Sequence, residues 1–281
     1  MSAFPRERLP RRPLRVAVIQ NSAGSDPDVN RRALQRLLAR APASDLIALP
    51  EVFGIRGCDA DYRRAAAAVP SETTRWLAAA AAVRRCWLLA GSILERRRGR
   101  IYNTSLVFDR SGALRARYRK IHLFEARLDD GRVIRERSVY EAGSRPVMLM
   151  LEGWRCGLSI CYDLRFPELY RLYADRGAHL LFAPANFTQR TGRDHWDVLV
   201  RARAIENQCF VVAPGQCGAN PATGVASYGH SLVVGPWGEV LARAGDRETC
   251  LAVTLDPDRL RETRRRIPVL RHRRLVRVTR R

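Results

Sequence analysis

Three residues of the sequence could together carry out attack on a carbonyl carbon: Glu51, Lys120 and Cys161. A thiol needs a base that takes its proton, and a carboxylate can serve when burial raises its pKa. The charge that develops on a carbonyl oxygen needs a fixed positive donor, which an ammonium provides. The three side chains would therefore form a complete set for acyl transfer, without a metal ion or a histidine.

Lys120 is also the only lysine in the chain, so the other 49 of the 50 Lys and Arg residues are arginine. Arginine is a planar fork with five donors, whereas lysine is a compact point charge on a thin stem. The single lysine is either a chance survivor on a solvated face or a position where only a compact ammonium fits. The sequence by itself leaves these two interpretations open.

Each of the three residues follows a segment that is predicted to be a strand. Glu51 follows a strand over 45–49, Lys120 follows the second arm of a hairpin over 101–118, and Cys161 follows a strand over 156–160. When strands are parallel, this edge is where ligand sites form. Taken singly, Glu51 would be a solvated turn carboxylate and Cys161 a buried core thiol. The combination of the three residues at strand ends favours a catalytic role over these structural ones.

The rest of the pattern predicts a layered α/β sheet in one domain. Further strands are expected at 14–20, 86–90, 147–151, 179–183, 209–213, two within 228–243, and 250–255. Helices are expected from about 26 to 41 and over 71–85, 167–176, 194–206 and 256–266, with a long loop over 125–146. We expect a basic flexible leader over 1–13, a single domain over 14–270 and a basic tail over 271–281.

The net charge of +22 suggests a nucleic-acid-binding or scaffold protein as one alternative. The arginines are spread along the whole chain, however, and their clusters at both ends and at 96–98 lack interleaved aromatic residues. Solvated surface charge is therefore the favoured interpretation. A complex with RNA that persists at moderate salt would support the alternative.

The cysteines and histidines predict neither a disulfide framework nor a metal site. The seven cysteines are scattered and contain no C-x-x-C pair, which fits a reducing cytoplasm. His195 and His230 lack the spacing of paired metal ligands. No apolar run approaches the roughly 18 residues of a membrane span. We expect no metal, no cofactor and no membrane association.

Three stretches resemble the motifs of the nitrilase (carbon–nitrogen hydrolase) superfamily: 49–51, 118–124 and 157–168. Supporting stretches lie at 102–104, 195–196, 201–208, 227–231 and 236–238. The resemblance implies a four-layer αββα sandwich, with Glu51 as general base, Lys120 as transition-state stabiliser and Cys161 as nucleophile. It also implies a second glutamate after the lysine. Glu125 and Glu136 compete for that position, and the spacing of Glu136 matches better.

The motif around Cys161 indicates which branch of the superfamily the chain resembles. Residues 161–168, Cys-Tyr-Asp-Leu-Arg-Phe-Pro-Glu, resemble the Nit-type amidases, that is, omega-amidase and deaminated glutathione amidase. This implies hydrolysis of a small carboxylate-bearing primary amide to acid and ammonia through a cysteine thioester. N-carbamoyl amino acid amidohydrolase and nitrilase are the alternatives within the superfamily.

The same resemblance gives further expectations about the site and the assembly. The backbone N–H of Tyr162 would share the oxyanion with Lys120. Arg165 would pair with the substrate carboxylate, or else serve as a structural partner of Asp163 or Glu168. A homodimer or higher homo-oligomer is expected, although the sequence departs from the family pattern at 275–278.

Overall fold

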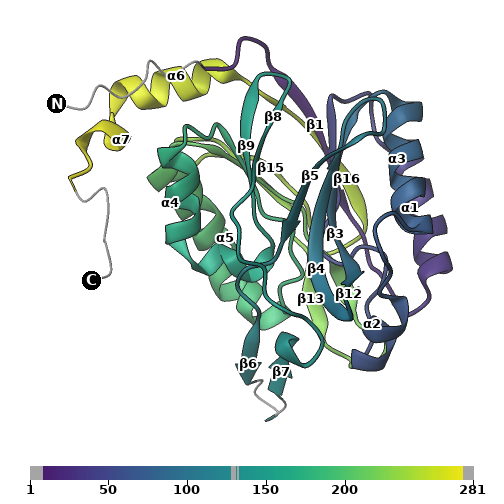
Figure 1. Ribbon diagram of the computed structural model, residues 1–281. Coiled ribbons are helices and arrows are strands. Elements are labelled where there is room, and N and C mark those ends of the chain that lie inside the picture. Colours follow the sequence, from purple (N-terminus) through teal and green to yellow (C-terminus); the bar gives the residue numbers. More distant parts are fainter. Residues whose placement is uncertain (1–8, 128–130, 132, 275–281) are drawn as a thin grey trace.

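Two mixed β-sheets form the centre of the molecule in the computed structural model, which describes residues 9–127, 131 and 133–274 (Figure 1). The first sheet has the strand order β16-β1-β2-β3-β4-β5. Its strands are β1 (Leu14–Gln20), β2 (Leu46–Ala48), β3 (Trp87–Arg97), β4 (Arg100–Phe108), β5 (Leu114–Arg119) and β16 (Thr249–Leu255).

The second sheet has the order β15-β14-β11-β10-β9-β8. Its strands are β8 (Met148–Leu151), β9 (Trp154–Leu158), β10 (Leu180–Phe182), β11 (Phe210–Ala213), β14 (Leu232–Val234) and β15 (Val240–Arg243). Two small hairpins lie outside the sheets: β6 (Glu125–Arg127) with β7 (Val133–Arg135), and β12 (Cys217–Ala219) with β13 (Ala226–Tyr228).

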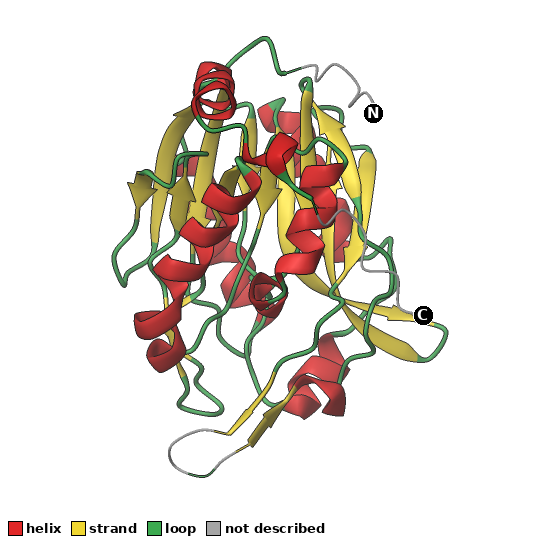
Figure 2. Cartoon of the chain, turned by 90° about the vertical axis from the view of Figure 1, so that its left-hand side faces the viewer, coloured by secondary structure: helices red, strands yellow, loops and turns green. Residues whose placement is uncertain are grey.

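Helices cover the outer face of each sheet. The helices α1 (Pro27–Arg40) and α3 (Glu72–Arg84) cover the first sheet, and α4 (Pro167–Asp175) and α5 (Gln189–Asn207) cover the second. Figure 2, seen from the side of α4 and α5, shows the helices in front of the strands. The resulting order of layers is αββα, as the sequence predicted. The remaining helices are α2 (Asp59–Ala65), α6 (Pro257–Arg266) and α7 (Val269–His272).

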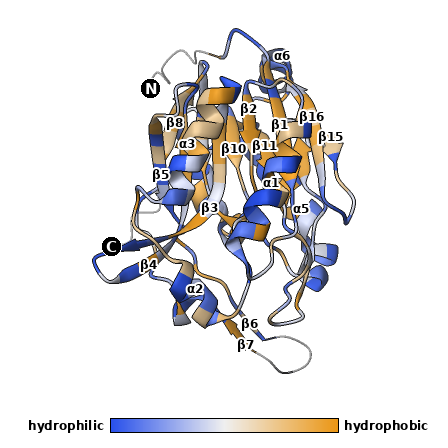
Figure 3. Cartoon of the chain, turned by 90° about the vertical axis from the view of Figure 1, so that its right-hand side faces the viewer, coloured by the Kyte–Doolittle hydropathy of each residue, from blue (hydrophilic) through white to orange (hydrophobic). Residues whose placement is uncertain are grey.

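The alternation of side chains along β1 explains why this strand is apolar on both faces. Val16 and Val18 point into the core between the two sheets, whereas Ala17 and Ile19 belong to the core under α1 and α3. Successive residues of a strand face opposite sides, so a strand between two layers has to be apolar throughout. Figure 3 shows the central strands β1, β2, β10 and β11 in the hydrophobic colour.

Helix starts follow the local signals of the sequence. The side chain of Asp26 accepts hydrogen bonds from the backbone N–H groups of Asp28 and Val29 at the beginning of α1. Ser71 accepts from the N–H of Thr74 at the beginning of α3. Both caps satisfy N–H groups that have no partner within the helix.

The structure corrects several predicted boundaries. The 125–146 stretch, predicted as a long loop, contains the β6–β7 hairpin and a 3₁₀ turn over Glu136–Ser138. The side chains of β6 and β7 are exposed or only partly buried, so no apolar alternation marks them. Strand β3 continues to Arg97 instead of ending at residue 90, and α5 begins at Gln189 instead of residue 194. Helix α2 and strands β12 and β13 were not predicted, because each is too short for a periodic signal.

The two ends of the chain lie partly outside the described residues, namely 1–8 of the predicted leader and 275–281 of the predicted tail. Within the leader, Pro10 is buried and the carbonyl of Arg12 accepts a hydrogen bond from Trp154 Nε1 at 3.2 Å. Residues 10–12 thus pack against the second sheet. Among the described helices, none combines the length and the apolar composition that crossing a membrane requires.

Candidate active site

The three chemically interesting residues follow strands that run in the same direction within each sheet. Strands β2 and β3 are parallel, β4 is antiparallel to β3, and β5 is antiparallel to β4. The carboxyl ends of β2 and β5 therefore lie at one edge, which places Glu51 and Lys120 together. In the second sheet, Cys161 follows β9, which is parallel to β10. Helix α2 and the two small hairpins lie at the end of the sandwich opposite α6 (Figure 1).

The backbone around Glu51 is held in an unusual shape. A Cβ atom on Gly91 would lie 1.9 Å from the carbonyl oxygen of Pro50, so only glycine allows β3 to approach this close. Val52 has a φ of 45°, which is strained for a β-branched residue. Its N–H donates to Ser92 Oγ at 2.9 Å, and Gln216 Nε2 donates to the carbonyls of Glu51 and Val52. These contacts fix the direction of the Glu51 side chain.

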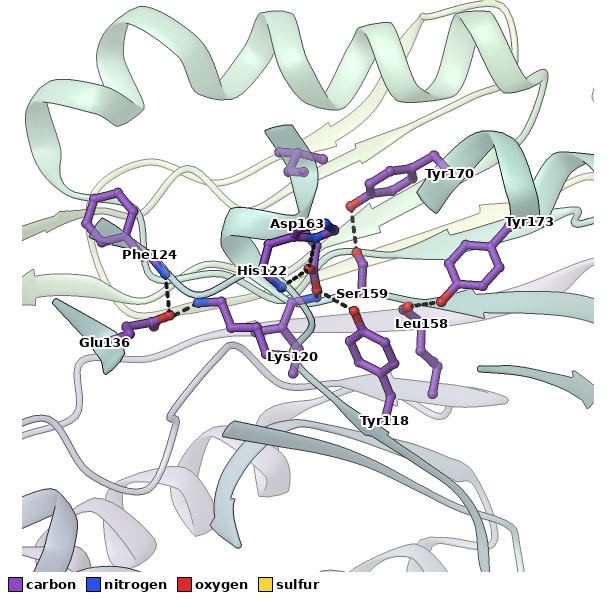
Figure 4. A network of polar contacts seen from close by, with 12 residues as sticks. Tyr118, Lys120, His122, Phe124, Glu136, Leu158, Ser159, Asp163, Tyr170 and Tyr173 are labelled. Atoms are coloured by element: carbon purple, nitrogen blue, oxygen red, sulfur yellow. Dashed lines mark hydrogen bonds and ion pairs between the residues drawn. The ribbon is translucent and has the colours of Figure 1, made fainter. Parts of the chain in front are cut away.

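Lys120 lies between two carboxylates. Its Nζ is 2.8 Å from Glu51 Oε1 and 2.8 Å from Glu136 Oε1. Asn103 Nδ2 donates to the same oxygen of Glu51 at 2.9 Å, while the Asn103 carbonyl accepts the backbone N–H of Lys120. The backbone N–H of Phe124 donates to Glu136 Oε2 at 2.7 Å (Figure 4). The lysine, the two glutamates and Asn103 thus form one connected polar cluster, in which Lys120, Glu51 and Asn103 are buried.

The geometry distinguishes the two glutamates that competed in the sequence. Glu125 begins β6, its side chain is 54% exposed, and it pairs with Arg135. Glu136 begins the 3₁₀ turn that follows β7, its side chain is 16% exposed, and it contacts Lys120. Of these two residues, Glu136 is the one that belongs to the lysine cluster.

Cys161 lies on a tight turn between β9 and α4. Its φ of 48° is in the left-handed region, which is uncommon for residues other than glycine. Its own N–H donates to the Pro184 carbonyl at 2.9 Å, and the backbone of Asn186 acts on the thiol by lowering its pKa. The turn continues as a 3₁₀ helix over Cys161–Arg165. The left-handed turn, together with these bonds, fixes the position of the sulfur atom.

Asp163 joins the lysine segment to the nucleophile turn (Figure 4). Its Oδ2 accepts from Tyr118 Oη at 2.6 Å and from the N–H of Ile160 at 2.9 Å. Its Oδ1 lies 3.0 Å from the N–H of His122 and 2.7 Å from His122 Nδ1. Tyr118 and His122 flank Lys120 by two residues on each side. One fully buried carboxylate therefore fixes the two segments relative to each other.

Burial and charge shift the protonation equilibria in the cluster. Burial raises the pKa of the Cys161 thiol well above its usual value, and Glu51 adds to this rise, whereas Lys120 and the Asn186 backbone oppose it. Burial lowers the pKa of Lys120, but the charges of Glu136 and Glu51 outweigh it and hold that pKa well above its usual value. Burial also raises the pKa of Glu136, against the opposing effect of Lys120. Before substrate binds, the arrangement favours a thiol and an ammonium.

A cavity of about 610 Å³ opens over these residues. Glu51, Glu136 and Cys161 line it, together with residues from α2, the start of α5, and the 220–227 segment. Tyr162 and Arg165 also line it. The guanidinium of Arg165 lies 3.3 Å from His195 Nδ1 and 5.4 Å from the ring centroid of Phe187.

The contacts of Arg165 bear on one of its two predicted roles, that of a structural partner of Asp163 or Glu168. Among the described residues, neither Asp163 nor Glu168 is an ion-pair partner of Arg165. Its polar contacts go to the His195 ring instead. The Arg165 guanidinium lines the cavity and has no carboxylate partner among the described residues, so it can bind an anionic group there.

Two polar neighbours of the cluster were not identified from the sequence as site residues. Asn103 could have been found, because the predicted hairpin places it opposite Lys120 near the strand end. Asn186 carries no local signal, since it contacts the thiol from a loop after β10. Both histidines that were weighed as metal ligands have structural neighbours: His195 lies against Arg165, and the carbonyl of His230 accepts from Trp196 Nε1.

Residues 15–265 match the carbon-nitrogen hydrolase family over most of the chain. The chain belongs to this family. It is similar to the deaminated glutathione amidase of Synechocystis, with 37% identity over 269 residues that cover 93% of this chain and 98% of the relative. It is also similar to omega-amidase NIT2 of Homo sapiens, with 38% identity over 263 residues, 92% of this chain and 95% of the relative.

A solved structure shows the same architecture. The C. elegans NitFhit protein superimposes with a TM-score of 0.86 at 35% identity over 93% of this chain. The chain spans 65% of that longer protein. The membership predicted from the three motifs is thereby confirmed, and so is the fold: the chain is an enzyme of the carbon–nitrogen hydrolase family.

Proposed function

We propose that this hydrolase converts a small primary amide that carries a carboxylate into the corresponding acid and ammonia. The observation that supports this best is the buried cluster in which Lys120 bridges Glu51 and Glu136 beside the Cys161 thiol. This set supplies a base and a nucleophile that line one cavity, with a fixed cation hydrogen-bonded to the base.

In the first half of the reaction, Glu51 takes the proton of the Cys161 thiol while the sulfur attacks the amide carbon. The new carbon–sulfur bond leaves a negative charge on the carbonyl oxygen. Lys120 and the backbone N–H of Tyr162 stabilise this oxyanion. The carbon–nitrogen bond then breaks, and Glu51 returns its proton to the departing nitrogen, which leaves as ammonia.

In the second half, Glu51 takes a proton from a water molecule that attacks the thioester. The carbon–sulfur bond breaks, the acid leaves, and the proton returns to the Cys161 sulfur. Glu51 thus alternates between base and acid. Glu136 keeps Lys120 and Glu51 in position through its own contact with the ammonium.

The donor geometry of Lys120 supports the oxyanion role. An ammonium has three N–H donors. Among the described residues, two of them are directed at Glu51 and Glu136. The third is left for an oxygen atom of the substrate. The thiol's own backbone N–H donates to Pro184, so the next amide in the chain, that of Tyr162, is the one that can share the oxyanion.

Arg165 supports a carboxylate in the substrate. It lines the cavity, contacts aromatic rings and the His195 ring but no carboxylate among the described residues, and can bind a carboxylate with two parallel N–H groups. Relatives named deaminated glutathione amidase and omega-amidase point to the same class of substrate.

A substrate panel tests the proposal. Ammonia release is measured with α-ketoglutaramate, deaminated glutathione, N-carbamoyl amino acids and nitriles, in parallel for the wild type and Cys161→Ala. We expect the highest kcat/KM for a carboxylate-bearing amide and no turnover by Cys161→Ala. Preference for a nitrile or a carbamoyl compound, or turnover by the cysteine variant, would overturn the proposal.

We also propose that the chain forms a homo-oligomer and acts in the cytoplasm. Val198 and Ile205 on α5 and the nearby Trp237 are exposed apolar side chains, which suits a protein interface. All seven cysteines lie in the described part of the chain and are free thiols, as expected in a reducing compartment. Light scattering of the purified protein tests the assembly.

A further inference from the structure

Arg56 is a buried cation near the active site that has no carboxylate partner within residues 9–127, 131 and 133–274. Its side chain is 0% exposed. A guanidinium has five N–H donors, and all of those of Arg56 are directed at neutral oxygens. These are the carbonyls of Ala23 (2.9 Å), Gly218 (3.1 Å) and Ala219 (3.2 Å), Ser22 Oγ (3.3 Å) and Ser227 Oγ.

This arrangement is unusual within the chain. Arg203 is the other buried arginine of the described part, and it pairs with Glu206 at 2.7 Å. The buried carboxylate of Glu95 has two arginine partners. Burying a charge without a counter-ion is costly even when its hydrogen bonds are satisfied. Burial lowers the pKa of Arg56, but a guanidinium keeps its proton in proteins.

The position of Arg56 connects it to the thiol. It lies on the segment that follows Glu51, and it contacts the loop after β1 and both strands of the β12–β13 hairpin. Ser227, which lines the cavity, accepts from Arg56 and donates to Asn186 Oδ1 at 2.5 Å. The backbone of Asn186 in turn lowers the pKa of the Cys161 thiol. Two hydrogen bonds therefore connect the arginine to the residue whose backbone acts on the nucleophile.

The charge of Arg56 also reaches the wall of the cavity. Gly57, Asn220 and Ser227 line the cavity next to it, and Asn220 Nδ2 donates to the Gly57 carbonyl at 3.0 Å. Tyr62 of α2 lines the same wall. Burial raises the pKa of Tyr62, and the backbone of Gly57 and the charge of Arg56 oppose this rise. An uncompensated charge in such a poorly solvated region acts over several ångströms.

We propose that Arg56 is a positioning and specificity-determining residue whose charge, which no directly bonded carboxylate neutralises, makes this wall of the cavity electropositive and selects amides that carry a carboxylate. This role rests on the proposed amide hydrolysis. The hydrogen bonds of Arg56 hold the β12–β13 hairpin against the loop after β1, while its charge attracts the anion. Arg165 would then contact the carboxylate directly, and Arg56 would act from behind the wall.

The test neutralises the charge without removing the arginine. Ser22→Asp places a carboxylate next to the guanidinium, and Ser22→Asn is the matched neutral control. The substrates are succinamate and its methyl ester, which have the same amide but differ in charge. The readout is the selectivity ratio, that is, kcat/KM for succinamate divided by kcat/KM for the methyl ester. We expect Ser22→Asp to lower this ratio about tenfold, and Ser22→Asn to leave it within about threefold of the wild type.

Substitution of the arginine separates its charge from its hydrogen bonds. We expect Arg56→Met to lower the ratio by about tenfold or more, whereas Arg56→Lys keeps the ratio even if both activities fall. A purely structural role would lower both activities equally and leave the ratio unchanged in every variant. An equal ratio in Ser22→Asp and Ser22→Asn would overturn the proposal, whether or not Arg56→Met folds.

A second readout does not depend on turnover. Alkylation of Cys161 by iodoacetate and by iodoacetamide, followed by peptide mass spectrometry, reports attraction of an anion to the thiol. We expect the iodoacetate to iodoacetamide rate ratio to fall in Ser22→Asp and not in Ser22→Asn. If the wild type hydrolyses neither amide, the proposed function fails. The alkylation ratios still decide the role of Arg56, because equal ratios in the two variants would refute it.

Discussion

Two buried cations, Lys120 and Arg56, lie beside the same cavity and are stabilised in opposite ways. Lys120 contacts two carboxylates, each at 2.8 Å. Arg56 contacts five neutral oxygens and no carboxylate of the described chain. Both side chains are almost completely removed from water.

The difference indicates that Lys120 belongs to a cluster that exchanges protons during the reaction, whereas Arg56 carries a constant charge. Around Lys120, the glutamates, the thiol and the ammonium can exchange protons, since each interacts with the others. The hydrogen-bond acceptors of Arg56, in contrast, are carbonyls and hydroxyls, which do not exchange protons with it. Arginine occupies all of the Lys and Arg positions of the chain except this one, where lysine is retained beside the two glutamates. A compact ammonium fits between two carboxylates and still leaves one donor, whereas a planar guanidinium would fill that space.

The largest effect should come from removing a carboxylate of the Lys120 cluster. We expect Glu51→Gln to lower kcat for amide hydrolysis about 10³-fold, because the variant lacks both the base and the ion-pair partner. Ammonia release under saturating substrate measures this. Glu125→Gln is the matched control: its carboxylate pairs with Arg135 on the surface, so kcat should stay near the wild-type value. Similar losses in both variants would contradict the distinction between these glutamates.

A smaller effect is expected at Asp163, the anionic counterpart of Arg56. Its two oxygens accept four hydrogen bonds, three of them from neutral donors. Asp163→Asn replaces an acceptor by an N–H₂ group and leaves buried donors unpaired. We expect about 2 kcal/mol lower stability and a roughly tenfold to hundredfold lower kcat, since the two catalytic segments lose their common anchor.

Chemical denaturation and steady-state kinetics measure the two consequences of Asp163→Asn. Asp109→Asn, in the exposed turn after β4, is the control for a carboxylate that accepts only local hydrogen bonds. A wild-type kcat in a destabilised Asp163→Asn protein would show that Asp163 contributes to the fold but does not position the site.

The smallest effect is expected in the pH dependence of stability, because the buried basic group His179 can release its proton. His179 is fully buried, and burial, together with Arg264 and Arg155, lowers its pKa from 6.5 to about 3. The unfolded chain therefore binds a proton between these values, whereas the folded chain does not. The stability is fully present above pH 6.5 and is lost as the pH falls, by roughly 2 kcal/mol at pH 5.

Unfolding by urea at pH 7.5 and pH 5.0 measures this loss. His179→Asn keeps an acceptor near the N–H of Arg155, which donates to His179 Nδ1 at 3.1 Å, but it does not titrate. We expect the pH dependence of stability to shrink by about the same 2 kcal/mol in this variant. An unchanged dependence would mean that His179 is protonated in the folded protein and that burial without a counter-ion does not set its charge.

The sequence predicts those parts of the site that depend on strand ends. The strands before Glu51 and Cys161 are apolar on both faces, so their presence and the sheet edge at which they end could be inferred from residue type alone. The strand before Cys161 lies two residues earlier than the predicted 156–160. The helix after Cys161 was equally visible, because Pro167 marks its first turn. Lys120 was singled out because it is the only lysine, and the predicted hairpin before it placed it at a strand end.

The rest depends on contacts between distant segments, which leave no local pattern. In the sequence, Arg56 is one more arginine in an arginine-rich chain. Its set of neutral hydrogen-bond acceptors forms only when the segments at 22–23 and 217–227 meet around it. The β6–β7 hairpin was predicted as a loop, since strands exposed on both faces show no apolar alternation. The choice of Glu136 over Glu125 likewise required the fold of that hairpin.

The most direct test of the account is the activity of Lys120→Arg on its best carboxylate-bearing amide. The variant keeps the charge and changes only its shape. We expect kcat/KM to fall about 10³-fold, because the guanidinium cannot meet both carboxylates and the oxyanion in this space, while the protein still unfolds cooperatively. Activity within about tenfold of the wild type would contradict the claim that this site requires a compact ammonium.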